Sequence, residues 1–129
     1  MPHIHIEYSG NLEAALDIQG LCDAIRREAV SIDAFPLAGV RVRAIRVDHF
    51  AIADGNPQHG FIDLSVRLRE GRKDSVKKDA IARIFKVLRG YVDPILATHS
   101  IALSAEMRDI NAELSPKYGT IRAHLEAPE

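Results

Sequence analysis

The chain has 129 residues, which suffices for a single folded domain over residues 1–129 and not for two independent ones. Its 17 lysines and arginines against 18 aspartates and glutamates leave a net charge of −1, which excludes a global attraction to nucleic acid or a membrane surface. The one cysteine, Cys22, excludes a disulfide within the chain. Because the sequence also shows no signal-peptide pattern and no membrane-spanning stretch, we expect a cytoplasmic protein.

Residues 2–8 begin the chain with an alternation of apolar and polar side chains that predicts a β-strand. Asp17 is typical of a helix N-cap, and the apolar residues after it recur at helical spacing: Ile18, Leu21, Cys22, Ile25 and Ala29. The sequence FPLAG at residues 35–39 ends this helix, because Pro36 disfavours a helical backbone in the residue before it.

Residues 40–48 alternate again and predict a second strand, with an irregularity at Ala44 and Ile45 that indicates a bulge. Residues 48–60 contain DG and NP pairs and predict a loop or a hairpin-like excursion. Residues 61–69 alternate strictly and predict a half-buried strand.

Residues 74–96 hold a helical period of apolar side chains with lysines and arginines on the opposite side. Pro94 lies near the end of this segment and predicts a kink or an early end of the helix. Residues 100–110 alternate and predict a fourth strand, whereas residues 111–129 form a tail without a strong pattern.

The predicted order is strand, helix, strand, repeated in two units over about residues 2–48 and 61–110. Each helix connects two parallel strands, and right-handed crossovers place both helices on the same face of a shared sheet. The sequence therefore predicts an α+β domain of duplicated β-α-β units: a four-stranded mixed sheet with two helices on one face. We expect the other face to expose apolar surface, which favours packing against other copies of the chain.

Pro2 is the first candidate functional residue. After removal of Met1, its nitrogen is a secondary amine, and α-amino groups titrate near pH 8. Burial and neighbouring cations lower the pKa of an amine toward the range in which a general base works best. A second interpretation stays open from Pro2 alone, in which this residue only permits removal of Met1 and begins an edge strand.

Three arginines are candidates for binding an anion. Arg41 and Arg43 are two residues apart in a predicted strand and share a face, and Arg72 lies in the turn sequence EGRKD. Guanidinium groups bind carboxylates bidentately and stay charged, which suits a substrate with several carboxylates and an enolate-like transition state. Taken singly, each arginine also fits a role in surface solubility.

His3 and His5 share a strand face at a spacing that suits a metal, but no motif in the sequence supplies a third ligand, so no metal site is predicted. The phosphate-binding, dinucleotide-binding and serine-hydrolase motifs are absent from the sequence. Cys22 lacks the local setting of a nucleophile.

Together, the amino-terminal proline and the doubled β-α-β pattern resemble the tautomerase superfamily. Within it, the chain is similar to the 5-carboxymethyl-2-hydroxymuconate isomerase family, in segments that keep the family's order and spacing: PHIHIEYSGNL, FPLAGVRVRAIRVD, IADG, FIDLSVRLREGR and IALSAEMRDI. The resemblance covers about residues 2–111.

This resemblance implies that Pro2 is the catalytic base and that Arg41 and Arg72 bind substrate carboxylates and stabilise charge on the 2-oxo oxygen, with Arg43 and His3 as further substrate-binding candidates. The implied reaction converts an unsaturated 2-hydroxy tricarboxylate to a conjugated 2-oxo acid, without cofactor or metal, in bacterial homoprotocatechuate (4-hydroxyphenylacetate) degradation. It also implies a homotrimer that acts on a small polycarboxylate.

Two alternatives remain at this point. One is a tautomerase that prefers another substrate, such as a smaller 2-hydroxydienoate or a haloacrylate-like acid. The other is a non-catalytic domain in which the same arginines bind a carboxylate metabolite. Pro2 separates these classes, because an enzyme needs its amine for turnover and a binding domain does not.

Overall fold

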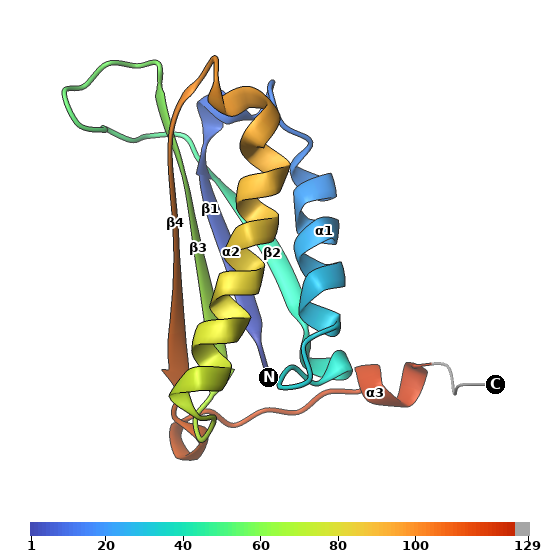
Figure 1. Cartoon of the computed structure of the whole chain (residues 1–129). Helices are drawn as coiled ribbons and strands as arrows, with labels where there is room; N and C mark the ends of the chain where they lie inside the picture. Colours follow the sequence, from blue (N-terminus) through green and yellow to red (C-terminus); the bar gives the residue numbers. More distant parts are fainter. Residues whose placement is uncertain (126–129) are drawn as a thin grey trace.

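The computed structural model describes residues 1–125, which form a sheet of four strands with two long helices on one face (Figure 1). The main elements are β1 (His3–Ser9), α1 (Ile18–Val30), β2 (Arg41–Val47), β3 (His59–Arg69), α2 (Asp74–Leu96) and β4 (Ser100–Ile110). A short helix, α3 (Ile121–His124), lies in the tail. Among the described residues, no helix is long and apolar enough to cross a membrane.

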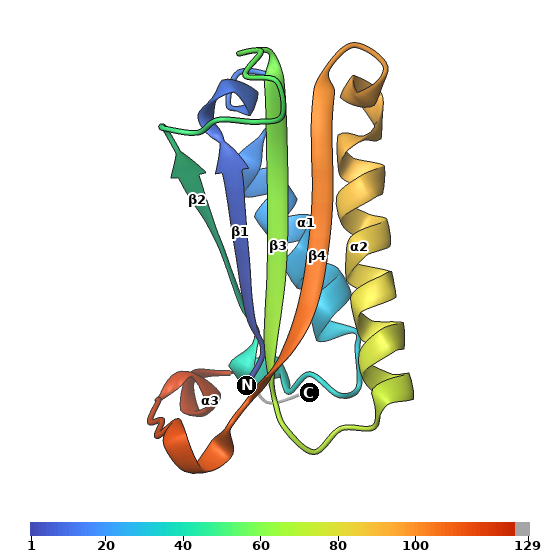
Figure 2. The same ribbon diagram turned by 90° about the vertical axis from the view of Figure 1, so that its left-hand side faces the viewer.

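The strand order is β2-β1-β3-β4. β1 pairs with β2 and β3 pairs with β4 in parallel, whereas β1 and β3 are antiparallel at the centre of the sheet (Figure 2). Each β-α-β unit thus supplies one parallel pair, and the predicted mixed sheet with both helices on one face is confirmed.

Alternation along the strands forms the core. In β1 and β3, every second side chain is buried beneath the helices, where they meet the apolar stripes of α1 and α2: Ile4, Ile6, Ile62, Leu64, Val66, Leu21, Ile25, Ile84 and Leu88. Full burial of each such side chain contributes about 1.5–3 kcal/mol to folding.

The predicted start of α1 is confirmed at its N-cap. Asp17 has an extended backbone, and its Oδ1 accepts a hydrogen bond from the Gly20 N–H at 3.0 Å. This bond pairs one of the amide donors that the first helical turn leaves unbonded.

Two local predictions are wrong. β2 contains no bulge, because it pairs with β1 in unbroken register from Arg41 to Val47. The irregular pattern arises because Ile45 is on the open face with 45% of its surface exposed, while Arg46 forms ion pairs with Glu13 and Asp48.

The early end of α2 at Pro94 is also wrong, since the helix continues to Leu96, whereas the kink predicted as its alternative stays a prediction. Pro94 lies in the last turn of the helix, so its missing N–H and the clash of its ring with the preceding turn disturb only the end of α2.

The face of the sheet opposite the helices is mostly polar, so the predicted apolar surface is wrong. Facing pairs of β1 and β3 carry imidazole, carboxylate, hydroxyl and guanidinium groups: His3 with Arg67, His5 with Ser65, and Glu7 with Asp63. Strict alternation is the reason, because it directs the apolar side chains of both strands toward the helices.

Candidate active site

The candidate site lies at the edge of the sheet where β1 begins. The tail leaves β4 at this edge and crosses beside the N-terminus before it forms α3 (Figures 1 and 2). Glu70 fixes the start of the tail, because its N–H donates to the Ile110 carbonyl at 3.1 Å and its Oε2 accepts from the Ala112 N–H at 2.8 Å. The tail therefore forms one wall of the site.

Two hollows lie between this edge and the tail. The strand hollow has a volume of about 660 Å³, and its charged lining comes from His3, Arg41, Arg67, Arg69 and Lys117. The loop hollow has a volume of about 760 Å³, and its charged lining comes from Arg41, Arg69, Glu70, Arg72, Lys117 and Arg122. Met1 lines both hollows, so they meet at the start of the chain.

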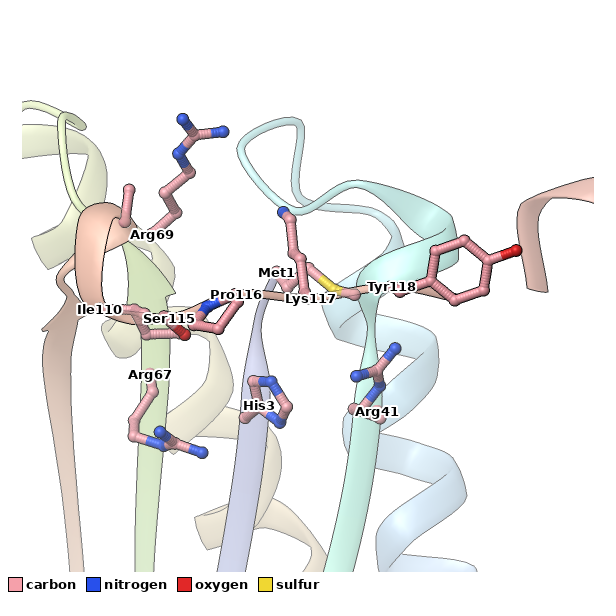
Figure 3. Close-up of a pocket in the computed structure, with 11 residues that line it drawn as sticks. Met1, His3, Arg41, Arg67, Arg69, Ile110, Ser115, Pro116, Lys117 and Tyr118 are labelled. Atoms are coloured by element: carbon pink, nitrogen blue, oxygen red, sulfur yellow. The ribbon is translucent and has the colours of Figure 1, made fainter. Parts of the chain in front are cut away.

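Strand register places an imidazole between two guanidinium groups in a row across the sheet. His3 in β1 pairs with Arg41 in β2 on one side and with Arg67 in β3 on the other. Figure 3 shows the imidazole between the two guanidinium-bearing side chains, with Met1 and the tail beside them. The row thus combines residues from both β-α-β units.

Pro2 is fully buried directly behind Met1. Its carbonyl accepts a hydrogen bond from the Arg41 N–H at 3.4 Å, and a Cβ built on Gly39 would lie 3.3 Å from its Cδ. Since β1 is an inner strand, Pro2 does not begin an edge strand, and that part of the simpler interpretation is wrong. The Pro2 nitrogen bonds to Met1, the residue at which both hollows meet.

Arg72 lies near the chain start although about seventy positions separate them in sequence. Its Nη1 donates to the Arg69 carbonyl at 3.2 Å and its Nη2 donates to the Ala34 carbonyl at 3.1 Å. Arg43 lines neither hollow, and its Nη1 lies 3.4 Å from Nδ1 of His3. The structure therefore places Pro2, His3, Arg41 and Arg72 near the start of the chain. Arg43 contacts His3 and lines neither hollow.

Positive charge dominates the electrostatics of the site. Burial lowers the pKa of the Met1 α-amino group below its ordinary value of 8.0, and the charges of Lys117, Arg72, Arg69 and Arg41 lower it further. Within residues 1–125, none of these four side chains forms an ion pair with a carboxylate. An amine at this position is thus favoured in its neutral, basic form.

His3 is neutral at pH 7. Burial, followed by the charges of Arg67, Arg41 and Arg43, lowers the pKa of its imidazole below 6.5. A guanidinium only donates hydrogen bonds, so Nδ1 of His3 accepts from Arg43 and the ring proton is on Nε2. His3 can therefore donate a hydrogen bond to an anion through Nε2.

The lining residues that sequence reasoning missed include Arg67, Arg69, Lys117 and Tyr118. The two arginines carry the same signal as Arg41 and Arg43, since they are two residues apart in one strand. Nothing in the sequence pattern of the tail distinguishes Lys117 or Tyr118, because only its path across the sheet edge brings them to the site.

His3 and His5 do not complete a metal site in the part of the chain that the structure describes. Among these residues, no group of three or more histidine, cysteine or acidic side chains is arranged to hold a metal ion.

Comparisons with known proteins agree with this arrangement. The family model described as 5-carboxymethyl-2-hydroxymuconate isomerase matches residues 2–125. A curated relative from Escherichia coli, 5-carboxymethyl-2-hydroxymuconate Delta-isomerase, is 26% identical over 123 residues, which are 95% of this chain and 98% of the relative.

Solved structures match equally well. A crystal structure of 5-carboxymethyl-2-hydroxymuconate delta-isomerase superposes with a TM-score of 0.88 at 31% identity, covering 100% of this chain and 95% of the other. A 5-carboxymethyl-2-hydroxymuconate isomerase from Deinococcus radiodurans R1 superposes with a TM-score of 0.89 at 30% identity, covering 95% and 92%. A fused 4-OT described as a symmetric trimer shares the fold at 16% identity and a TM-score of 0.55, covering 86% and 89%.

Proposed function

The chain belongs to the 5-carboxymethyl-2-hydroxymuconate isomerase family, and we propose that it isomerises 5-carboxymethyl-2-hydroxymuconate with Pro2 as general base. One observation carries the role of Pro2: the start of the chain lies at the junction of two hollows among cations that favour a neutral amine. Removal of Met1 transfers the free amine to Pro2, the next residue of the chain.

The proposed reaction moves one proton from oxygen to carbon. The neutral Pro2 nitrogen accepts the proton of the 2-hydroxyl group as the C2–O bond becomes a carbonyl. The double bonds shift along the dienol, and the protonated amine returns the proton to C5 at the far end. The product is the conjugated 2-oxo acid, and the amine is neutral again, so proton and electron pairs balance.

Arg41 and Arg72 supply fixed positive charge in this proposal. Arg41 lines both hollows, and Arg72 keeps N–H donors free after its bonds to Arg69 and Ala34. Guanidinium groups bind carboxylates bidentately and stabilise the negative charge that develops on the 2-oxo oxygen. His3 adds a donor through Nε2, whereas Arg43 acts on His3 and not on the substrate.

We further propose that the protein is a homotrimer in the cytoplasm, in a pathway of aromatic-compound degradation. The trimer is supported by the fused 4-OT of the same fold. The cytoplasmic location is supported by Cys22, which is a free thiol.

The first experiment follows the ultraviolet decay of 5-carboxymethyl-2-hydroxymuconate with protein whose intact mass shows that Met1 is removed. We expect decay well above the rate of spontaneous ketonisation. 2-Hydroxymuconate, which lacks the carboxymethyl arm, serves as comparison. If the protein accelerates the decay of 2-hydroxymuconate alone, the substrate is the smaller compound. If it accelerates the decay of neither compound, the result contradicts an isomerase of this class.

A further inference from the structure

We propose that Arg69 and Lys117 form an anion subsite, which binds the carboxylate of the substrate's carboxymethyl arm. This inference rests on the proposed function and deepens it, because it assigns the residues that distinguish a tricarboxylate from a dicarboxylate. Neither residue stood out in the sequence.

The first argument is position. Arg69 ends β3 and Lys117 lies in the tail, yet both line the strand hollow and the loop hollow. In the view of Figure 3, both side chains extend to the same side of Met1, whereas Arg67, His3 and Arg41 lie on the other side. A substrate that contacts Arg41 near Pro2 therefore reaches Arg69 and Lys117 with a different part of its structure.

The second argument is uncompensated charge. Some cations elsewhere in the described chain have carboxylate partners, such as Arg46 with Asp48 at 2.7 Å and Lys77 with Asp109 at 3.2 Å. Within residues 1–125, neither Arg69 nor Lys117 has one. Like charges that share a hollow repel one another, and a bound anion relieves that repulsion.

Within residues 1–125, Glu70 forms no ion pair with Arg69 or Lys117. Its side chain is the one carboxylate among the described lining residues of the loop hollow, and it accepts a hydrogen bond from the Ala112 N–H at 2.8 Å. That bond fixes the start of the tail and so helps to place Lys117. Glu70 is therefore a positioning residue for the subsite.

The third argument is stoichiometry. The proposed substrate has three carboxylates, and a guanidinium pairs bidentately with one carboxylate. Arg41 and Arg72 account for two, and Arg72 is already partly engaged by backbone carbonyls. The third carboxylate needs a further cation, and Arg69 and Lys117 provide two.

The test compares KM values for 5-carboxymethyl-2-hydroxymuconate and 2-hydroxymuconate in Arg69→Ala and Lys117→Ala. Hydrogen bonds to charged groups predict that KM for the tricarboxylate rises about tenfold, with a much smaller change in kcat. The rise for the dicarboxylate is several-fold smaller. Arg69→Lys, which retains the charge, recovers most of the loss. An equal rise for both compounds in both variants overturns the subsite.

Arg89→Ala and Lys78→Ala are matched controls, because both residues are exposed on α2 and line neither hollow. Melting temperatures of all variants establish that they are folded.

A binding measurement separates failure of the subsite from failure of the proposed function. Calorimetric titration with tricarballylate and with glutarate requires no turnover. We expect the wild type to bind tricarballylate at least about tenfold more tightly, and the Arg69→Ala, Lys117→Ala double variant to lose this preference. If the wild type has no isomerase activity but still prefers tricarballylate, the result contradicts the proposed function and supports the subsite. An unchanged preference in the double variant overturns the subsite.

Discussion

The guanidinium of Arg72 is hydrogen-bonded to the backbone of Ala34, with Nη2 and the carbonyl oxygen 3.1 Å apart. This bond joins the turn after β3 to the segment before β2, so Arg72 connects the two β-α-β units. Its second bond, to the Arg69 carbonyl at 3.2 Å, holds the plane of the guanidinium in place. Arg72 is therefore both a cross-link between the units and a fixed positive charge in the loop hollow.

Replacement of Arg72 by alanine is expected to lower kcat/KM by about 100-fold, because fixed donors to a developing oxyanion have effects of this size. Loss of the two backbone hydrogen bonds lowers the free energy of unfolding by about 1–2 kcal/mol. Arg72→Lys keeps the charge but not the bidentate geometry and should recover only part of the activity. Steady-state kinetics and urea unfolding measure the two effects, and an unchanged kcat/KM contradicts the role of Arg72.

Pro2→Ala is expected to lower kcat, because a primary amine on a more flexible residue replaces the fixed secondary amine of Pro2 as the base. Affinity for tricarballylate should stay near the wild-type value, because Arg41 and Arg72 are unchanged. Protein that retains Met1 is a natural control, since its Pro2 nitrogen is an amide and has no basicity. Turnover by a preparation shown by mass spectrometry to retain Met1 throughout contradicts Pro2 as the base.

The pH dependence of kcat/KM should show an ascending limb below pH 8.0, the ordinary value for an α-amino group. Burial and the charges of Lys117, Arg72, Arg69 and Arg41 lower the pKa of the amine at the chain start. The base must be neutral to accept a proton, so activity rises as the pH increases through this lowered pKa and is lost below it.

Lys117→Gln removes the charge that lowers the pKa of the terminal amine most among these four residues. It should therefore shift the ascending limb to higher pH. Lys78→Gln removes an equal charge from the exposed face of α2 and should leave the limb in place. Identical limbs in both variants and the wild type would refute the electrostatic account of the base.

Gly39→Ala tests the close packing behind Pro2. A Cβ at this position would lie 3.2 Å from Met1 Cα and 3.3 Å from Pro2 Cδ, tighter than ordinary van der Waals contact, so we expect a displaced Pro2 and a lower kcat. Gly90→Ala is the matched control, because nothing lies within 4 Å of its Cβ. Because Gly90 is at an exposed position of α2, Gly90→Ala should raise the free energy of unfolding by up to about 1 kcal/mol. Equal kcat values in both variants would exclude a positioning role for Gly39.

Periodicity in the sequence determined the elements of the fold. Alternation over residues 61–69 and helical spacing over residues 74–96 both depend on neighbours along the chain, and each is confirmed. The local predictions that failed are the bulge at Ala44–Ile45 and the early end of α2 at Pro94. Both concern places where one residue departs from a pattern that its neighbours still satisfy.

The residue types of the site were also visible in the sequence, as an amino-terminal proline and paired arginines. Only the tertiary structure decided which of them meet. Parallel pairing aligns His3 with Arg41, antiparallel pairing aligns it with Arg67, and the path of the tail brings Lys117 to the same edge. Sequence patterns carry local periodicity, whereas a binding site depends on contacts between distant segments, and these form only when the sheet assembles.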